Sequence, residues 1–312
     1  MKLITELIDE YLEHLKSLNF RPGTISVRGY ALKAFAVWLE ETAGVRTPDR
    51  LRRRHPRAWQ VSLSKRLNPE GLPIKPRTVN KNIEGIQMFL EYLAEEGMIA
   101  GALTHVLKYV RTPEPLPRVL PHEKIRAMLD SIDMSTPAGH RNRTMLETLY
   151  SSGTRAAELL GLDVGDVSLS EHVALVCGKG QKERIVPVGV TAIRFLESYL
   201  RGVRPGLVKN PEEKAMFLDR EGNRMPYYTL RRIIVDIAEK AGLGGEVTAH
   251  VFRRSCASEL VKGNASIYHV SRMLGHESLD TLKHYVKLHI ADLKETHHRT
   301  HPRERDEEER EK

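Results

Sequence analysis

Cysteines and long apolar runs are both scarce in this chain of 312 residues, and each absence removes a class of protein. The two cysteines, Cys177 and Cys256, lie far apart and form no CxxC pair. They argue against a disulfide framework or a zinc–cysteine site and fit a reducing compartment. No stretch approaches the roughly 18 uninterrupted apolar residues of a membrane span. We therefore expect a soluble, globular protein of the cytoplasm that has no membrane partner.

Acidic residues are nearly absent from the segment between Arg46 and Lys81. This segment holds eleven Lys or Arg residues but only two acids, Asp49 and Glu70. Together with the net charge of +8, this bias indicates a polyanionic partner, whose binding would weaken as salt rises. A solvated basic loop is the alternative that composition leaves open. The candidate phosphate-contacting residues of this part are Arg52, Arg53, Arg54, Arg77 and Lys81.

The first third of the chain has the periodicity of helices. Apolar residues recur at helical spacing over 3–18, 24–42 and 78–96, and the first of these predicts an amphipathic helix and not a signal peptide. Gly97 suits the C-terminal end of the third helix. Thr78 is a candidate cap for its start, which would place Arg77 and Lys81 at the positive end of the helix dipole.

A proline-rich stretch divides the chain. Residues 111–121, RTPEPLPRVLP, contain four prolines, which remove backbone donors and favour extended conformations. We predict an interdomain linker over 112–120 between a first domain over 1–111, which contains the basic segment, and a second domain over 121–300. The end of the chain, 301–312, is charged and poor in apolar residues, so it is predicted to be a flexible tail.

The second domain is predicted to be mostly helical, with one β-hairpin. Helices are expected over 122–131, 140–150, 190–201, 227–242, 251–262, 266–274 and 278–290. A further short helix carries Arg155 and Glu158, with Ser152 or Thr154 as its cap. Two β-like runs, 173–177 and 184–188, are joined by a basic, glycine-containing turn with Lys179 near its tip. The fold class is therefore mainly α, in two domains.

Five short motifs follow one another in the second domain. They are GTRAAELLGL with Arg155, GKGQKER with Lys179, HVFR with His250 and Arg253, LGH with His276, and HYV with Tyr285. Each motif is weak alone, but their order and spacing closely resemble the tyrosine recombinase (phage integrase) family, and within it the Xer-like branch. The resemblance covers nearly the whole chain. It implies an all-α, SAM-like core-binding domain followed by a mixed α/β, mostly helical catalytic domain with a small β-sheet.

The resemblance implies a site-specific recombinase that cleaves and rejoins DNA through a 3′-phosphotyrosyl intermediate on Tyr285. Attack on a phosphodiester builds negative charge on the phosphate oxygens, and the forks of Arg155 and Arg253 can each hold such oxygens. His250 and His276 add donors and proton exchange near neutral pH. Lys179 would protonate the leaving 5′ oxygen. Glu158 is expected to orient Arg155.

The same chemistry implies no cofactor. The bond energy is retained in the covalent intermediate, so ATP is not required, and the cationic side chains take the place of a metal ion. His297, His298 and His301 form a cluster in a polar tail without carboxylate or cysteine partners, so no metal site is assigned to them.

Several local alternatives stay open in the sequence. Lys182 competes with Lys179 for the acid role, Arg155 and Glu158 could form only a surface ion pair, and His250 could only cap its helix. The chain also departs from the family at Arg254, where histidine is usual, and at Val286, where threonine is common. None of these departures removes a catalytic group.

The resemblance also implies the partners. These are double-stranded DNA with paired recombination sites and a homo-tetramer on DNA, alone or with a second recombinase, that forms and resolves a Holliday junction. The protein would be nucleoid-associated, and the basic insert at 46–66 suggests a mobile element. Additional candidate DNA contacts are Arg224, Arg231 and Lys283. A type IB topoisomerase-like nicking enzyme and a non-enzymatic DNA-binding protein are the competing hypotheses.

Overall fold

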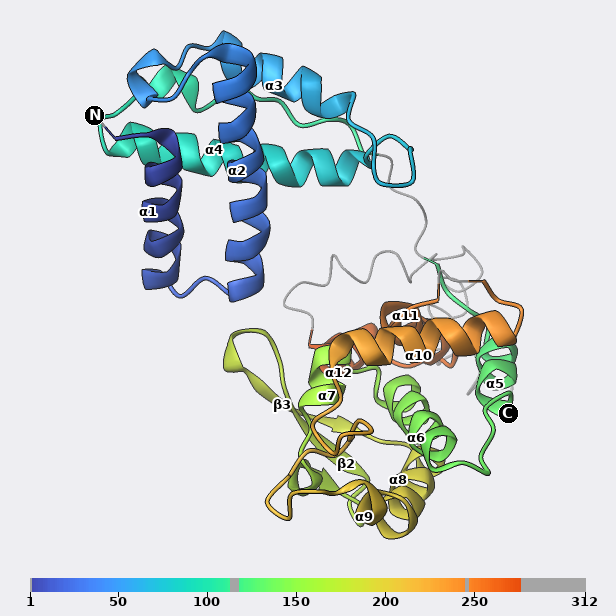
Figure 1. The fold of residues 1–312 in the computed structure, drawn as a ribbon. Helices are drawn as coiled ribbons and strands as arrows, with labels where there is room; N and C mark the ends of the chain where they lie inside the picture. The colour runs from blue at the N-terminus through green and yellow to red at the C-terminus, as the bar shows by residue number, and fades with distance from the viewer. Residues whose placement is uncertain (1, 113–117, 245–246, 276–312) are drawn as a thin grey trace, which may run out of the picture. The chain divides into compact units, whose positions relative to one another are not determined.

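The chain forms two compact units, Met1–Pro115 and Leu116–Lys312. The computed structural model describes residues 2–112, 118–244 and 247–275, and Figure 1 shows the elements of each unit. Each unit holds its own apolar core. Within the described ranges, no helix is both long and apolar enough to cross a membrane.

The N-terminal unit is built from helices. They are α1 (Ile4–Ser17), α2 (Pro22–Ala43), α3 (Arg54–Ser64) and α4 (Pro76–Glu95). Helices α1 and α2 lie side by side and α4 crosses both (Figure 1), burying side chains such as Leu7, Phe35 and Phe89 between them. The helices predicted over 3–18, 24–42 and 78–96 are confirmed, because their apolar faces form this core.

Helix α3 occupies the middle of the basic segment, where the periodicity did not reveal a helix. Pro56, Trp59 and Leu63 face the core, and the Trp59 ring packs edge-on against Phe35 with centroids 5.4 Å apart. Its arginines remain exposed. The solvated-loop alternative is therefore wrong for Arg54–Ser64, since one face of this stretch is buried.

Thr78 does not cap α4, contrary to the prediction. The helix begins at Pro76, with Lys75 in extended conformation as its N-cap. Proline is favoured at the first helical position, because its fixed φ suits the helix and its missing N–H would have no helical partner there. Gly97 takes a left-handed φ of 70° directly after the helix, as its placement at the C-terminal end predicted.

The C-terminal unit surrounds a buried central helix with further helices and a small sheet. Its helices are α5 (His122–Asp130), α6 (Pro137–Ser152), α7 (Ala156–Gly161), α8 (Val190–Gly202), α9 (Arg204–Leu207), α10 (Tyr227–Lys240), α11 (Ala249–Lys262) and α12 (Ile267–Leu274). Helix α6 packs against α8 and α11, and its inward side chains include Met145, Leu146 and Leu149. The helix predicted over 278–290 lies outside the described residues.

The sheet is three-stranded and antiparallel, in the order β1-β2-β3. Strand β1 spans Val167–Ser168, β2 Val173–Cys177 and β3 Glu183–Pro187. Cys177 pairs with Glu183 at the end of the hairpin. The predicted hairpin is confirmed, and the turn between β2 and β3 contains Lys179.

Candidate active site

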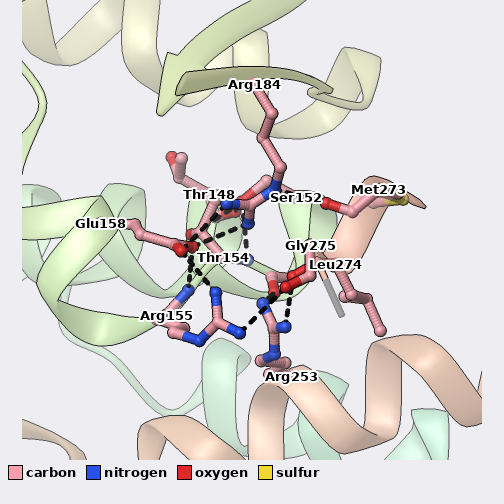
Figure 2. A network of polar contacts seen from close by, with 11 residues as sticks. Thr148, Ser152, Thr154, Arg155, Glu158, Arg184, Arg253, Met273, Leu274 and Gly275 are labelled. Atoms are coloured by element: carbon pink, nitrogen blue, oxygen red, sulfur yellow. Dashed lines mark hydrogen bonds and ion pairs between the residues drawn. The ribbon is translucent and has the colours of Figure 1, made fainter. Parts of the chain in front are cut away.

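Three segments far apart in sequence meet beside α7. They are the turn that ends α6, helix α11, and the C-terminal end of α12 (Figure 2). Arg253, on α11, joins the other two: its Nη1 donates to the Gly153 carbonyl at 2.7 Å, and its Nη2 donates to the Leu274 carbonyl. The residue is only 5% exposed, so its guanidinium is fixed by these contacts inside the unit.

Arg155 enters the same place from the start of α7. It is the N-cap residue of that helix, so the predicted caps Ser152 and Thr154 are wrong. Ser152 still belongs to α6, where its hydroxyl donates to the Thr148 carbonyl at 2.7 Å. The Nη1 of Arg155 donates to Glu158 at 2.7 Å and its Nη2 to the Gly275 carbonyl at 3.2 Å. About a third of the Arg155 side chain, 35%, remains accessible.

Glu158 is the buried carboxylate of the site, with 3% of its side chain exposed. It accepts hydrogen bonds from the backbone N–H of Arg155 and from the guanidinium groups of Arg155 and Arg184. Burial by itself would raise the pKa of this carboxyl, but the hydrogen bonds from Arg184 and Arg155 outweigh it and lower the pKa to about 2. Glu158 is therefore ionised at neutral pH and is not a mere surface partner of Arg155.

Arg184, on β3, is a member of this network that sequence reasoning missed. Its Nη1 and Nη2 donate to the two oxygens of Glu158 at 2.9 and 2.8 Å, and its Nε donates to the Met273 carbonyl at 2.9 Å. Strand alternation contained a signal for it, because Arg184 shares a face with the buried Val186 while Ile185 points outward. An arginine at an inward strand position requires a buried partner.

Three arginines hold the end of α12. We call Arg155, Arg184 and Arg253 the arginine cluster. They donate to the consecutive carbonyls of Gly275, Met273 and Leu274, respectively. The last carbonyls of a helix accept no hydrogen bond from the helix itself, and the helix dipole favours positive charge beside them. The cluster therefore fixes the chain immediately before His276, the next residue in the sequence.

Two glycines make this close approach possible. Gly153, which ends α6, has a φ of 59°, and a Cβ there would lie 2.7 Å from a methyl carbon of Leu274. Gly275, which ends α12, has a φ of 64°, and a Cβ there would lie 3.0 Å from Cζ of Arg184. Both glycines have a left-handed backbone and a neighbouring side chain close to where a Cβ would lie. A residue with a side chain is therefore disfavoured for two separate reasons.

His250 lies on α11, three residues before Arg253, and is accessible to solvent. Partial burial, followed by the charges of Arg254, Arg253 and Arg155, lowers the pKa of His250. The lowered pKa favours the neutral imidazole, which can accept a proton. Arg254, which stands where the family usually has histidine, contributes to this field.

The β2–β3 hairpin begins its turn against the arginine cluster. A Cβ on Gly178 would lie 3.4 Å from both Oε1 of Glu158 and Nη1 of Arg184. Lys179 is the next residue and starts the short helical turn Lys179–Gln181. The backbone thus brings the start of the turn to the side of the site where Glu158 lies.

Several predicted residues lie outside the part of the chain that the structure describes. They are His276, Tyr285 and Lys283, and the histidines of the C-terminal cluster lie outside it too. Among the residues that the structure does describe, no group of three or more His, Cys, Asp or Glu side chains could hold a metal ion.

The predicted DNA-contacting residues that are described all lie at the surface. Arg77, Lys81 and Arg231 are exposed on α4 and α10, and Arg53 precedes α3. Others also contact the protein: Arg52 donates to the Asp49 carbonyl, Arg54 to the ring of His55, and Arg224 to the carbonyls of residues 160 and 162 and to Asp163. Their role toward DNA stays a prediction.

Comparison with known proteins gives the class of this fold and site. Residues 118–291 match the phage integrase family. The chain is 36% identical to tyrosine recombinase XerC of Myxococcus xanthus over 231 residues, which cover 73% of this chain and 77% of the relative. It is 31% identical to tyrosine recombinase XerD of Listeria innocua over 305 residues, covering 96% of this chain and all of the relative.

A solved structure agrees with the fold. The XerH site-specific recombinase bound to palindromic difH substrate in a post-cleavage complex has a TM-score of 0.72 and 22% identity, covering 94% of this chain and 84% of that one. The chain belongs to the phage integrase family of tyrosine recombinases, enzymes that cleave and rejoin DNA strands. The predicted family, enzyme class and fold class are confirmed.

Proposed function

We propose that this chain recombines paired DNA sites by nucleophilic attack of Tyr285 on a backbone phosphate. A 3′-phosphotyrosyl bond forms as the bond to the 5′ oxygen breaks, and the 5′-hydroxyl leaves. A 5′-hydroxyl from a partner strand then attacks the phosphotyrosyl bond and frees Tyr285. One exchange gives a Holliday junction and a second resolves it.

The observation that carries this proposal is the meeting of Arg155 and Arg253 at the end of α12, with His250 on the same helix as Arg253. Guanidinium groups can stabilise the charge that develops on the phosphate oxygens during attack. The neutral His250 is suited to proton exchange. His276 follows Gly275 directly in the sequence, and we propose that it completes the ring of donors.

Lys179 is proposed as the acid that protonates the leaving 5′ oxygen. The closeness of Gly178 to Glu158 and Arg184, each 3.4 Å from a Cβ built on Gly178, supports this role, since the turn starts beside the arginine cluster. Fixed positive charge at the phosphate is sufficient for this chemistry in our proposal, so the reaction would need neither a metal ion nor ATP. We further propose that the active species is a tetramer on two duplex sites, as an exchange between paired sites requires.

The nucleophile is tested by trapping the covalent intermediate. The substrate is a duplex sequence that the protein selects from a randomised library. It is nicked on the 3′ side of the cleavage point, so that the short fragment released with the 5′-hydroxyl diffuses away. We expect the wild type to accumulate a covalent protein–DNA adduct that peptide mapping locates at Tyr285, and Tyr285→Phe to give none, because the phenol oxygen is absent.

Tyr268→Phe is the matched control, because Tyr268 on α12 is 60% exposed and belongs to no contact of the site. It should form adduct at the wild-type rate. An adduct that persists in Tyr285→Phe, or that maps to another residue, would contradict the assignment. Strand exchange between two copies of the selected site, as opposed to relaxation of one supercoiled circle, separates recombination from a topoisomerase-like activity.

A further inference from the structure

Among the contacts described, those of Arg184 link three parts of the site. It starts on β3, donates through Nη1 and Nη2 to Glu158, and donates through Nε to Met273 at the end of α12 (Figure 2). Only 16% of its side chain is exposed. A guanidinium supplies these donors in one rigid plane, which the flexible, compact ammonium of lysine cannot do.

The charge of Arg184 matters for Arg155. Glu158 lies 2.7 Å from Arg155 and 2.8 Å from Arg184. If Glu158 had Arg155 as its single partner, the two would form a neutral pair, with little attraction left for a phosphate. With Arg184 present, the two guanidinium groups and one carboxylate carry a net positive charge. Arg155 can then be oriented by Glu158 and still attract an anion.

The Arg184 guanidinium also lies close to the hairpin turn and to the end of α12. A Cβ built on Gly178 would lie 3.4 Å from its Nη1, and a Cβ built on Gly275 would lie 3.0 Å from its Cζ. Gly178 directly precedes Lys179, and Gly275 directly precedes His276. One side chain therefore lies between the segments that lead to two predicted catalytic groups.

From these contacts we propose that Arg184 is a positioning residue, which holds Glu158 with Arg155, the end of α12 and the start of the Lys179 turn in one arrangement. It does not itself touch the reacting phosphate. The proposal rests on the recombinase chemistry proposed above for its effect on rate, but its structural part can be measured without any reaction.

The test compares Arg184→Gln, Arg184→Lys and the wild type on the nicked duplex used above. We expect Arg184→Gln to form the covalent adduct about 100-fold more slowly, because small displacements of catalytic groups have effects of this size. Its dissociation constant for the uncleaved duplex should stay within about threefold, since positioning acts on the transition state more than on ground-state binding. Arg184→Lys should recover part of the rate.

Arg201→Gln is the control, because Arg201 on α8 is 80% exposed and pairs only with the exposed Glu197 among the contacts described. It should match the wild type. If Arg184 acts through Glu158, the double variant Glu158→Gln/Arg184→Gln should be no slower than the worse of the two single variants. Multiplied defects in the double variant would overturn that route.

Hydrogen–deuterium exchange of the DNA-free protein gives the readout that needs no activity. Arg184→Gln should speed exchange in peptides covering 178–184 and 270–275 and leave α8 unchanged, with Arg184→Lys intermediate. Unchanged exchange in both peptides, or equal losses of binding and cleavage, would overturn the positioning role. Failure of the wild type to form an adduct would instead count against the proposed function, while the exchange data would still decide the role of Arg184.

Discussion

At the scale of the residue, the site depends on one buried carboxylate shared by two arginines. Glu158 would be costly to bury alone, and hydrogen bonds from Arg184 and Arg155 offset that cost. The ion pair with Glu158 also restrains the Arg155 side chain, although a third of that side chain is accessible to solvent. The orientation of Arg155 is therefore fixed by contacts within the protein itself.

The depressed pKa of Glu158 makes a prediction about stability and pH. A carboxyl whose pKa falls from 4.5 to about 2 on folding stabilises the protein above pH 4.5, and this contribution is lost as pH falls from 4.5 through about 2. Each pKa unit corresponds to about 1.4 kcal/mol, so the contribution at pH 7 is on the order of 3 kcal/mol. Urea unfolding between pH 3 and 7 should show Glu158→Gln less stable by that order at pH 7, with the difference shrinking below pH 4.5.

Glu197→Gln provides the comparison, because Glu197 forms an exposed ion pair with Arg201. Exposed pairs contribute little, so this variant should stay close to the wild type at every pH. A gap between wild type and Glu158→Gln that does not change with pH would show that the charge of Glu158 is not what stabilises the unit.

At the scale of the element, the site is made where helices end. Helix α6 ends at Gly153, α7 starts at Arg155 and α12 ends at Gly275. At the ends of α6 and α12, backbone carbonyls accept hydrogen bonds from the side chains of Arg155, Arg184 and Arg253. The sequence predicted most of the helices, because their apolar faces repeat at helical spacing. It missed α3 and the caps of α4 and α7. Proline starts α4, and at the start of α7 the Arg155 N–H donates to the nearby Glu158 carboxylate, so neither start depends on a Ser or Thr side chain.

The end of α12 gives a prediction at this scale. Gly275→Ala should lower the stability of the C-terminal unit by about 1–2 kcal/mol, the usual cost of a left-handed conformation for a residue with a Cβ. It should also slow adduct formation, because the new methyl group would press on the guanidinium of Arg184. Thermal unfolding and the nicked duplex measure the two effects.

Gly242→Ala separates the two causes. Gly242 follows α10 in the same unit with a φ of 69°, and nothing lies within 4 Å of a Cβ built there. It should lose similar stability but cleave at the wild-type rate. If both variants cleave equally well, contact between Gly275 and Arg184 has no part in catalysis.

At the scale of the whole molecule, the chain divides into units with separate cores. The buried apolar residues of Met1–Pro115 and those of Leu116–Lys312 belong to different clusters. The basic segment 46–81 belongs to the first unit and the arginine cluster to the second. We propose that the units are the DNA-binding and catalytic domains, with the linker over 112–120, the catalytic domain over 121–300 and the tail over 301–312.

This division predicts the behaviour of the separated pieces. Residues 1–115 and 116–312, expressed alone, should each unfold cooperatively in calorimetry, because each retains its own core. The second piece should bind duplex DNA with a weaker dependence on salt than the full chain, since the basic segment and its phosphate contacts are gone. Equal salt slopes for the two would place the phosphate contacts elsewhere, and a piece that does not fold would contradict the division.

The sequence by itself determined the family, the mainly helical fold and the identity of the candidate catalytic residues, because motif order and apolar periodicity are properties of the chain alone. Only the tertiary structure decided that Arg155 and Arg253 meet at the end of α12, that Glu158 is buried and shared, and that Arg184 belongs with them. The partners of Arg184 are 26 and 89 residues away in the chain. Strand alternation can indicate that Arg184 points inward, but it cannot indicate which residues it contacts, since that depends on how whole helices and strands pack.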